Sequence, residues 1–328
     1  MVSGEQISKS KNIQQQTGKT FYFATLLLPK RVRYATHILY AFFRIADEIV
    51  DTSENKESYV KIEQIDQIQK AVLGESLTDE PSLKAFEELR RRYEIPTGEI
   101  IAFLDAMRMD ISKNRYETFS EVEEYMRGSA VTVANMMVSI MKIKETEKII
   151  ETAAALGKAF QLTNFLRDVR EDIIEYNRSY MPKETLDKYG VEYKHIENLE
   201  FSNEFSKVME EEISRAEDFY RKGIEGIEHL PNDCQFAVLL ASVLYADHHR
   251  LIVNRRYDVL THRSTLNMQD KIICLVKTWW HLKVTKDPKA TFYLTTGMLD
   301  DRGEKYKTVQ KSLRRAFSMK KLLVNFQK

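Results

Sequence analysis

Two acidic clusters in apolar sequence constrain this chain most. Asp47 and Asp51 are four residues apart, and Asn164, Asp168 and Asp172 repeat that spacing twice. Residues four apart lie on one face of a helix, about 5–6 Å from each other, where like charges repel. Both clusters follow apolar and aromatic residues, so the carboxylates need compensation, for which a divalent cation is the natural candidate.

Arginines accompany both clusters, at Arg44, Arg167, Arg170 and Arg178. Guanidinium groups bind phosphate bidentately, and Mg²⁺ commonly bridges carboxylates to phosphate oxygens. Together these residues predict a metal–diphosphate site above an apolar cavity, where the diphosphate could act as a leaving group. The spacing alone leaves a solvated acidic helix face as an alternative.

Composition excludes several classes of protein. The 328 residues carry a formal net charge of +1, which gives no electrostatic case for a nucleic-acid partner. Cys234 and Cys274 lie far apart in sequence, so we expect neither a zinc site nor a disulfide. The first 19 residues are polar and no run of about 18 apolar residues occurs, so we expect a cytoplasmic protein without a signal peptide or a membrane span.

The sequence predicts an all-α protein. Only 11 glycines and six prolines occur, and the prolines fall between segments of helical periodicity. We expect residues 1–19 to be loosely ordered, 52–74 to include a linker and 177–193 to form a loop. We expect helices over 31–50, 81–93, 97–112, 119–143, 145–176, 202–229, 232–255 and 267–283. No linker rich in Ser or Gly divides the chain, which favours a single helical domain.

Several motifs together resemble a known family. Residues 40–51 (YAFFRIADEIVD) and 161–172 (QLTNFLRDVRED) are similar to the two aspartate motifs of squalene and phytoene synthases. Further matches lie at 18–21, 125–130, 178–182 and 257–260, in the order expected for the family. The resemblance covers residues 17 to 290 and, within the family, is strongest to phytoene synthases of the bacterial and archaeal kind.

The resemblance implies a fold and an activity. The fold would be a single-domain isoprenoid synthase bundle around a central apolar cavity, with the catalytic domain at 20–304. The reaction would be head-to-head condensation of two geranylgeranyl diphosphates through a cyclopropylcarbinyl diphosphate, prephytoene diphosphate, to phytoene in carotenoid biosynthesis. The cofactor would be Mg²⁺, with Mn²⁺ as an alternative, and no NADPH is expected.

The resemblance also assigns roles to individual residues. The expected metal-binding positions are Asp47, Asp51, Asp110, Asn164, Asp168 and Asp172. A solvated helix carboxylate is an equal alternative for Asp110. Tyr245 joins Asp47, Asp51, Asp168 and Asp172 in the expected catalytic set. The expected contacts with substrate or diphosphate are Lys19, Thr20, Phe21, Tyr40, Arg44, Arg167, Arg178 and Arg263.

This chain departs from the family pattern at several positions. Arg127 stands where many bacterial members have a tyrosine that contacts substrate, and Val131 and Ala134 replace common glycines. Thr25 follows Phe21 by one helical turn, and a small residue there favours C20 over C15 substrates.

The sequence is also consistent with other functions. The main alternative is a C15 enzyme of the squalene or dehydrosqualene type that uses farnesyl diphosphate. A class I terpene cyclase and a non-catalytic assembly or interaction protein are further alternatives, although the intact aspartates argue against the last.

Three segments outside the motifs also carry expectations. Residues 305–328 contain eight basic residues and no acid, interleaved with apolar residues. They predict either a peripheral membrane contact or a solvated amphipathic helix. We expect His248 and His249 to form a polar turn of a helix, and Trp279 and Trp280 to serve packing.

Overall fold

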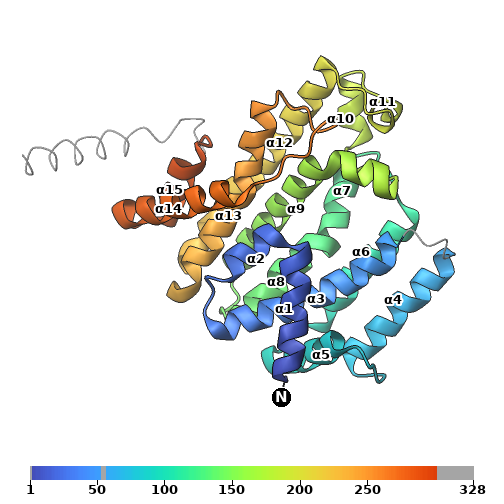
Figure 1. The fold of residues 1–328 in the computed structure, drawn as a ribbon, viewed down its shortest axis with the longest axis vertical. Helices are drawn as coiled ribbons and strands as arrows, with labels where there is room; N and C mark the ends of the chain where they lie inside the picture. The colour runs from blue at the N-terminus through green and yellow to red at the C-terminus, as the bar shows by residue number, and fades with distance from the viewer. Residues whose placement is uncertain (1, 53–56, 301–328) are drawn as a thin grey trace, which may run out of the picture.

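The computed structural model describes residues 2–52 and 57–300, and these residues form helices and no strand (Figure 1). A single β-bridge pairs Tyr116 with Pro182. The helices in chain order are α1 Gly4–Thr17, α2 Lys19–Thr25, α3 Lys30–Asp51, α4 Ser58–Leu73, α5 Pro81–Tyr93, α6 Thr97–Ser112, α7 Phe119–Met126, η1 Arg127–Val131, α8 Thr132–Met141, α9 Glu147–Tyr176, α10 Lys183–Lys188, α11 Tyr193–Glu197, α12 Asn203–Gly223, η2 Ile224–His229, α13 Asn232–Asn254, α14 Met268–Thr285 and α15 Pro288–Thr296. The predicted all-α fold is confirmed.

Helix α9 is the centre of the bundle. The Thr146 hydroxyl accepts a hydrogen bond from the Ile149 backbone N–H and caps its start, and Asn177, in the left-handed conformation, ends it. The helix packs against α8, η1, α12 and α13, which is why it can be 30 residues long and buried on several sides. Helix α9, which carries the second acidic cluster, therefore lies among the other helices of the bundle (Figure 1).

Helix α3 carries the first acidic cluster and packs against α1, α4, α5 and α6. Its buried side includes Val32, Leu39 and Phe42, at helical spacing. At its C-terminal end, Lys61 Nζ donates to the carbonyl oxygens of Val50, at 2.7 Å, and of Thr52, at 3.1 Å. A lysine that caps the last carbonyls holds the acidic end of the helix in place.

A π-helical turn, η1, interrupts the helix predicted over 119–143. Its residues Ser129 and Ala130 line the central cavity. Gly128 makes the turn fit, because a Cβ there would lie 2.6 Å from the Ala102 carbonyl oxygen on α6. The prediction of one continuous helix was therefore wrong at this turn, a kind of interruption often found beside functional sites.

The expectation of a loosely ordered segment at 1–19 was wrong. Helix α1 begins with a capping box between Ser3 and Gln6, and it packs against α3. Gln14 is buried, with its side-chain oxygen 2.5 Å from His37 Nδ1 and its side-chain nitrogen 3.0 Å from Thr25 Oγ1. Polar contacts therefore anchor this helix, and a search for apolar periodicity does not detect them.

Two other segments also hold more helix than the sequence predicted. Residues 52–74 contain α4, whose buried Ile65 and Ile68 face the core. Residues 177–193 contain α10 and the start of α11. Both helices are short or largely polar, so their periodicity is weak.

The C-terminal region corrects two further expectations. His248 and His249 do lie within a helix, α13, but they are buried and contact the Ser264 carbonyl oxygen and the Thr163 hydroxyl. Trp279 and Trp280, which we expected to serve packing, are 50% and 40% exposed. The predicted tail at 305–328 lies outside the described residues. Among the residues described, α13 alone has the length and hydropathy of a membrane span, and 67% of that window is buried inside the fold.

Candidate active site

A cavity of about 310 Å³ lies between α2, α3, η1, α8, α9, η2 and α13. Its wall is mostly apolar and aromatic. Residues of the predicted site that line it are Phe21, Thr25, Tyr40, Ala134, Asn164 and Tyr245. Gly157, Gly223 and Gly226 also line it, and each lies so close to a neighbouring helix that a Cβ would clash. Close helix packing thus shapes the apolar wall.

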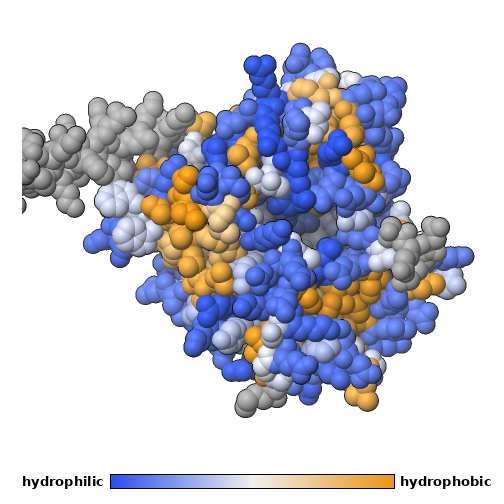
Figure 2. Space-filling view, viewed as in Figure 1, coloured by the Kyte–Doolittle hydropathy of each residue, from blue (hydrophilic) through white to orange (hydrophobic). Residues whose placement is uncertain are grey.

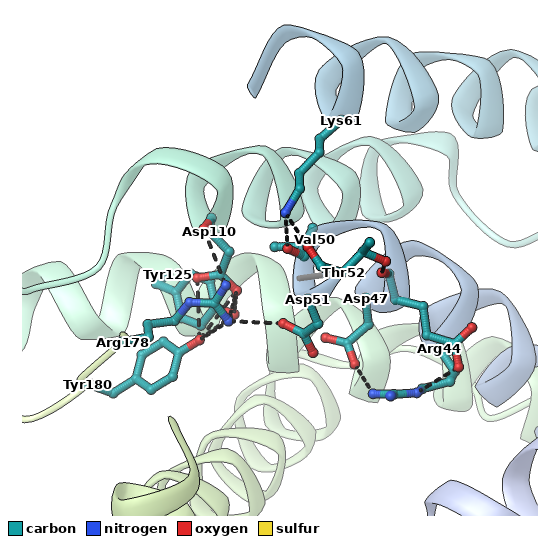
Figure 3. A network of polar contacts seen from close by, with 11 residues as sticks. Arg44, Asp47, Val50, Asp51, Thr52, Lys61, Asp110, Tyr125, Arg178 and Tyr180 are labelled. Atoms are coloured by element: carbon teal, nitrogen blue, oxygen red, sulfur yellow. Dashed lines mark hydrogen bonds and ion pairs between the residues drawn. The ribbon is translucent and has the colours of Figure 1, made fainter. Parts of the chain in front are cut away.

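The first acidic cluster is paired with arginines (Figure 3). Arg44 Nη1 lies 2.5 Å from Asp47 Oδ2, and its Nε lies 3.2 Å from Glu48 Oε1. Asp51, one turn further along α3, points toward Arg178, whose Nη1 lies 3.4 Å from Asp51 Oδ1. Residues of this cluster therefore already contact two of the arginines that the sequence predicted.

The second cluster lies on α9 and has its own arginines. Arg167 donates to both carboxylate oxygens of Asp168. Arg263, from the segment after α13, lies 3.5 Å from Asp168 and 2.8 Å from Glu171. Residues from two distant parts of the sequence therefore meet at this cluster, and the predicted contact of Arg263 with diphosphate stays a prediction.

Arg178 links α3 to a buried group that the sequence reading did not connect. Its guanidinium lies 3.7 Å from the Asp110 carboxylate and 3.4 Å from the Tyr180 hydroxyl. Asp110 also accepts hydrogen bonds from Tyr125, at 2.5 Å, and from Tyr180, at 3.3 Å (Figure 3). The Asp110 oxygens are thus held by two tyrosines and an arginine, so its solvated alternative was wrong, and its predicted role as a metal ligand stays a prediction.

The carboxylates repel one another across the site. Burial, and next the charge of Asp47, raise the pKa of Asp51 to about 7. Burial raises the pKa of Asp172 well above its ordinary value, and the charges of Asp168 and Asp51 add to the rise. Since Asp51 lies on α3 and Asp172 on α9, the effect of Asp51 on the pKa of Asp172 indicates that the two clusters face each other.

The donor set fits a hard divalent cation shared with a phosphate. Among the described residues, no three acidic, histidine or cysteine side chains are arranged to hold a metal ion by themselves. Mg²⁺ seldom uses such a cage, because it binds through one or two carboxylates and completes its shell with substrate phosphates and water. Asp47, Asp51, Asp168 and Asp172, with the Asn164 amide, supply oxygen ligands of the required kind.

Comparison with known proteins identifies the family. The family model described as squalene/phytoene synthase matches residues 14–270. The chain belongs to the squalene/phytoene synthase family. A phytoene synthase of Arthrospira platensis is 31% identical over 81% of this chain and 89% of its own length. A 15-cis-phytoene synthase of Synechococcus elongatus is 27% identical over 83% and 91%, respectively.

Solved structures show the same fold. A dehydrosqualene synthase crystallised with a ligand superposes with a TM-score of 0.76, at 25% identity, over 85% of this chain and 97% of that one. A squalene synthase from Alicyclobacillus acidocaldarius superposes with a TM-score of 0.69, at 19% identity, over 77% and 95%. The predicted isoprenoid synthase fold of this family is therefore confirmed.

Among the remaining predicted residues of this squalene/phytoene synthase family member, Phe21, Tyr40 and Tyr245 line the cavity, whereas Lys19 and Thr20 do not. Tyr245 stacks on Phe160, with ring centroids 4.6 Å apart, and the ring of Phe21 lies 6.1 Å from that of Tyr40. Lys19 is exposed at the start of α2, and the residue that follows it, Thr20, is half-buried. The substrate and catalytic roles that the sequence assigned to these residues stay predictions.

Two arginines point away from the carboxylates. Arg170 donates to the Leu260 carbonyl oxygen, at 2.5 Å, and so fixes the segment after α13. Arg127 pairs with Glu99, at 3.1 Å, on the outside of the bundle. Arg127 therefore does not replace the substrate contact of the tyrosine found in many bacterial family members.

The sequence reading missed Lys271. This residue of α14 is only 6% exposed, and burial lowers its pKa, followed by the positive charges of Lys19 and Arg167. Lys271 therefore lies within range of the charges of Lys19 and Arg167, and we expect these three cations to attract an anion such as a diphosphate. Lys271 stands outside every motif, so no sequence pattern indicated its position.

Replacing Lys271 by glutamine should raise the KM for a prenyl diphosphate about tenfold, because one hydrogen bond to a charged group is lost. The Tm should not fall at pH 7, since a buried cation that repels its neighbours is removed. Steady-state kinetics and thermal unfolding measure both effects. Lys277→Gln, on the exposed side of the same helix, is the matched control. An unchanged KM for Lys271→Gln would contradict the assignment.

Gly18 lets Tyr40 reach the cavity mouth. A Cβ at Gly18 would lie 2.7 Å from the Tyr40 hydroxyl, which also contacts the Thr17 hydroxyl at 3.1 Å. Gly18→Ala should displace the ring and lower kcat/KM about 10- to 100-fold, as small misplacements of a positioning group do. Gly98→Ala, whose Cβ would meet no atom within 4 Å, is the control. Equal activity of the two variants would refute this role.

Proposed function

We propose that this protein is a Mg²⁺-dependent prenyltransferase that condenses two geranylgeranyl diphosphates head to head to phytoene. The observation that carries the proposal is the pair of opposed acidic clusters, with Arg44, Arg167 and Arg178 beside them, at an apolar cavity. The names of its relatives, which are phytoene synthases, support the same assignment. The product belongs to carotenoid biosynthesis.

In this reaction the protein has to stabilise the diphosphate as it leaves and to shield the carbocations from water. Bound Mg²⁺ would offset the negative charge that builds up on the departing diphosphate. Asp47, Asp51, Asn164, Asp168 and Asp172 would hold the ion, and the arginines would bind phosphate oxygens directly. Burial of Asp51 and Asp172 makes their charge costly, so binding of cationic ligands there is strongly favoured.

The reaction is balanced as two ionisations. In the first, the C1–O bond of one substrate breaks, diphosphate leaves, and the allyl cation is attacked by the double bond of the second substrate. Loss of a proton closes a cyclopropylcarbinyl diphosphate. Its own C–O bond then breaks, and rearrangement followed by loss of a second proton gives phytoene. The faces of Phe21, Tyr40 and Tyr245 can stabilise the cations, and the apolar wall excludes water.

Substrate length is the finer part of this proposal. Thr25 is buried in the cavity wall, where the Gln14 side chain donates to its hydroxyl at 3.0 Å. A small residue fixed in this position leaves room for a longer chain, which favours C20 substrates. The similarity to a solved dehydrosqualene synthase favours the C15 alternative, and that enzyme class therefore stays as the second candidate.

Product analysis by mass spectrometry tests the proposal. Geranylgeranyl and farnesyl diphosphates are supplied separately, with and without Mg²⁺ and with and without NADPH. We expect phytoene from the C20 substrate, with Mg²⁺ and without NADPH. A clear preference for farnesyl diphosphate would replace the C20 assignment with the C15 one, and a reduced product would indicate a squalene-type enzyme. No turnover of either substrate would favour a non-catalytic protein.

A further inference from the structure

Helix α14 presents an apolar face to solvent. Its exposed residues Ile272, Ile273, Val276, Trp279, Trp280 and Val284 fall on one side of the helix. Val276, for example, is 57% exposed to solvent although its side chain is apolar. Figure 2 shows hydrophobic residues gathered on the side of the molecule where Figure 1 places α14. An apolar area of this kind marks an interaction site.

The opposite side of α14 already has its partners. Cys274 and Thr278 are buried, and the helix packs against α13 and α15. The exposed side is less involved in this packing, since Ile272, Ile273 and Val276 are 48%, 50% and 57% exposed. Burial within the fold therefore does not account for its apolar character.

Basic residues predominate along this face between Asp270, in the first turn of α14, and Asp287, just after its end. Between residues 271 and 286 the chain has four lysines and no acid. Lys277, Lys283 and Lys286 are exposed, while Lys271 faces inward. An apolar helix face with tryptophans and flanking lysines is the pattern of a helix that lies in the plane of an anionic membrane surface. Tryptophan in particular prefers the boundary between acyl chains and headgroups.

We propose that α14 docks this protein on a bilayer that contains anionic lipid, with the side chains of Trp279 and Trp280 in the headgroup region. A fluid lipid surface accommodates an irregular, convex helix face, whereas a two-fold contact between copies would bring the lysines of both close together. The sequence after the described residues adds charge of the same sign, with eight basic residues and no acid at 305–328. The inference concerns a surface and does not depend on the proposed reaction.

The chain offers a direct probe, because Trp279 and Trp280 are its only two tryptophans. Tryptophan fluorescence of the whole protein therefore reports on α14 alone. The probe is a phosphatidylcholine vesicle in which about 30% of the lipid is anionic phosphatidylglycerol. When these vesicles are added, we expect the tryptophan emission to shift to shorter wavelength. Quenching by brominated lipid should confirm insertion. An emission spectrum that does not change while the protein co-sediments with vesicles would overturn the proposal, since another surface would then bind.

Variants in the full chain separate the contributions. Trp279→Ser/Trp280→Ser should weaken vesicle binding at least about tenfold, because two side chains no longer leave water. Lys277→Glu/Lys283→Glu should abolish the preference for anionic over neutral vesicles. The matched control is Ile101→Ser/Ile150→Ser, which removes two exposed apolar residues from α6 and α9 and should bind like the wild type.

Each outcome of this experiment decides the matter. Binding by the tryptophan variant equal to the wild type would refute α14 as the docking surface. Loss of binding only on charge reversal at Arg314 and Arg315 would assign docking to the tail instead. A wild type that ignores vesicles but forms a dimer, which the tryptophan substitutions dissociate, would show that a second copy covers the face. Turnover is measured separately, in detergent, where the docking variants should keep their activity.

Discussion

Replacing Asp51 by asparagine should abolish turnover and, at the same time, make the fold more stable. Asparagine keeps the shape of the side chain but carries no negative charge, so it binds a metal ion at the diphosphate site far more weakly. We expect kcat/KM to fall by at least about 10³-fold, the order lost when an electrostatic group of this kind is removed. Steady-state kinetics with geranylgeranyl diphosphate measure the fall.

The gain in stability follows from the pKa of Asp51. Folding raises it from its ordinary value of 3.8 to about 7, so the folded state holds the proton more tightly than the unfolded state does. Ionisation therefore costs stability, and this cost grows as the pH rises from about 4 to about 7 and stays constant above that. An asparagine side chain does not ionise and has no such cost, so at pH 8 we expect Asp51→Asn to gain on the order of 1–3 kcal/mol, seen as a Tm a few degrees higher.

The pH dependence gives the sharper check. The difference in Tm between the variant and the wild type should shrink as the pH falls from 8 toward 4, because the wild-type carboxyl then takes up its proton. Asp105→Asn, on an exposed carboxylate of α6 that pairs with Arg108, is the matched control and should change neither Tm nor kcat/KM. A lower Tm for the Asp51 variant, or activity within tenfold of the wild type, would contradict this account.

The same reasoning predicts how ligands act on the wild type. Mg²⁺ with inorganic diphosphate should raise its Tm, because ligands that bind only the folded state stabilise it. The Asp51 variant should gain less from the same addition. A large equal gain in both proteins would place the ion away from this carboxylate.

The sequence was sufficient to predict the acidic clusters because they combine two local signals, helical spacing and apolar surroundings. Asp47 and Asp51 on α3, and Asp168 and Asp172 on α9, needed no tertiary information beyond the assumption that the helices face each other. That assumption is supported by the charge of Asp51 on α3, which contributes to the raised pKa of Asp172 on α9, and by Arg178, which lies beside Asp51.

Other features depend on contacts between distant residues and leave no local pattern. Gln14 anchors α1 through His37 and Thr25, so a polar segment that looked loosely ordered is a packed helix. Lys271 is buried because α14 packs against α13, and there it lies within range of the charge of Arg167. Trp279 was expected to serve packing, but only the packing of α14 shows which side of this helix is exposed.

Replacing Arg178 by methionine should destabilise the fold more than any other single change at the site. Arg178 is only 8% exposed, and its guanidinium lies between the carboxylates of Asp51 and Asp110. Its removal leaves both carboxylates without the charge of this arginine. Breaking a buried ion pair from one side costs about 3–5 kcal/mol. Thermal or urea unfolding at pH 8 should show this loss, and kcat/KM should fall with it.

A second substitution separates the two carboxylates. Asp110→Asn in the Arg178→Met background should recover part of the lost stability, since one of the two uncompensated charges disappears. Arg178→Lys, which keeps the charge but loses the planar fork, should fall between the wild type and the methionine variant. No recovery in the double variant would mean that Asp110 is neutral before Arg178 is removed.

Asp110→Asn alone then decides what Asp110 does. In the structure its oxygens accept hydrogen bonds from Tyr125 and Tyr180 and lie close to Arg178. These contacts are those expected of a residue that positions an arginine. If this is its role, asparagine can still accept from Tyr125, and we expect kcat/KM to fall only about tenfold. If Asp110 instead binds the metal ion, as the resemblance implied, the loss should equal that of Asp51→Asn. The ratio of the two losses therefore distinguishes a metal ligand from a positioning residue, even though both substitutions remove a buried carboxylate beside the same arginine.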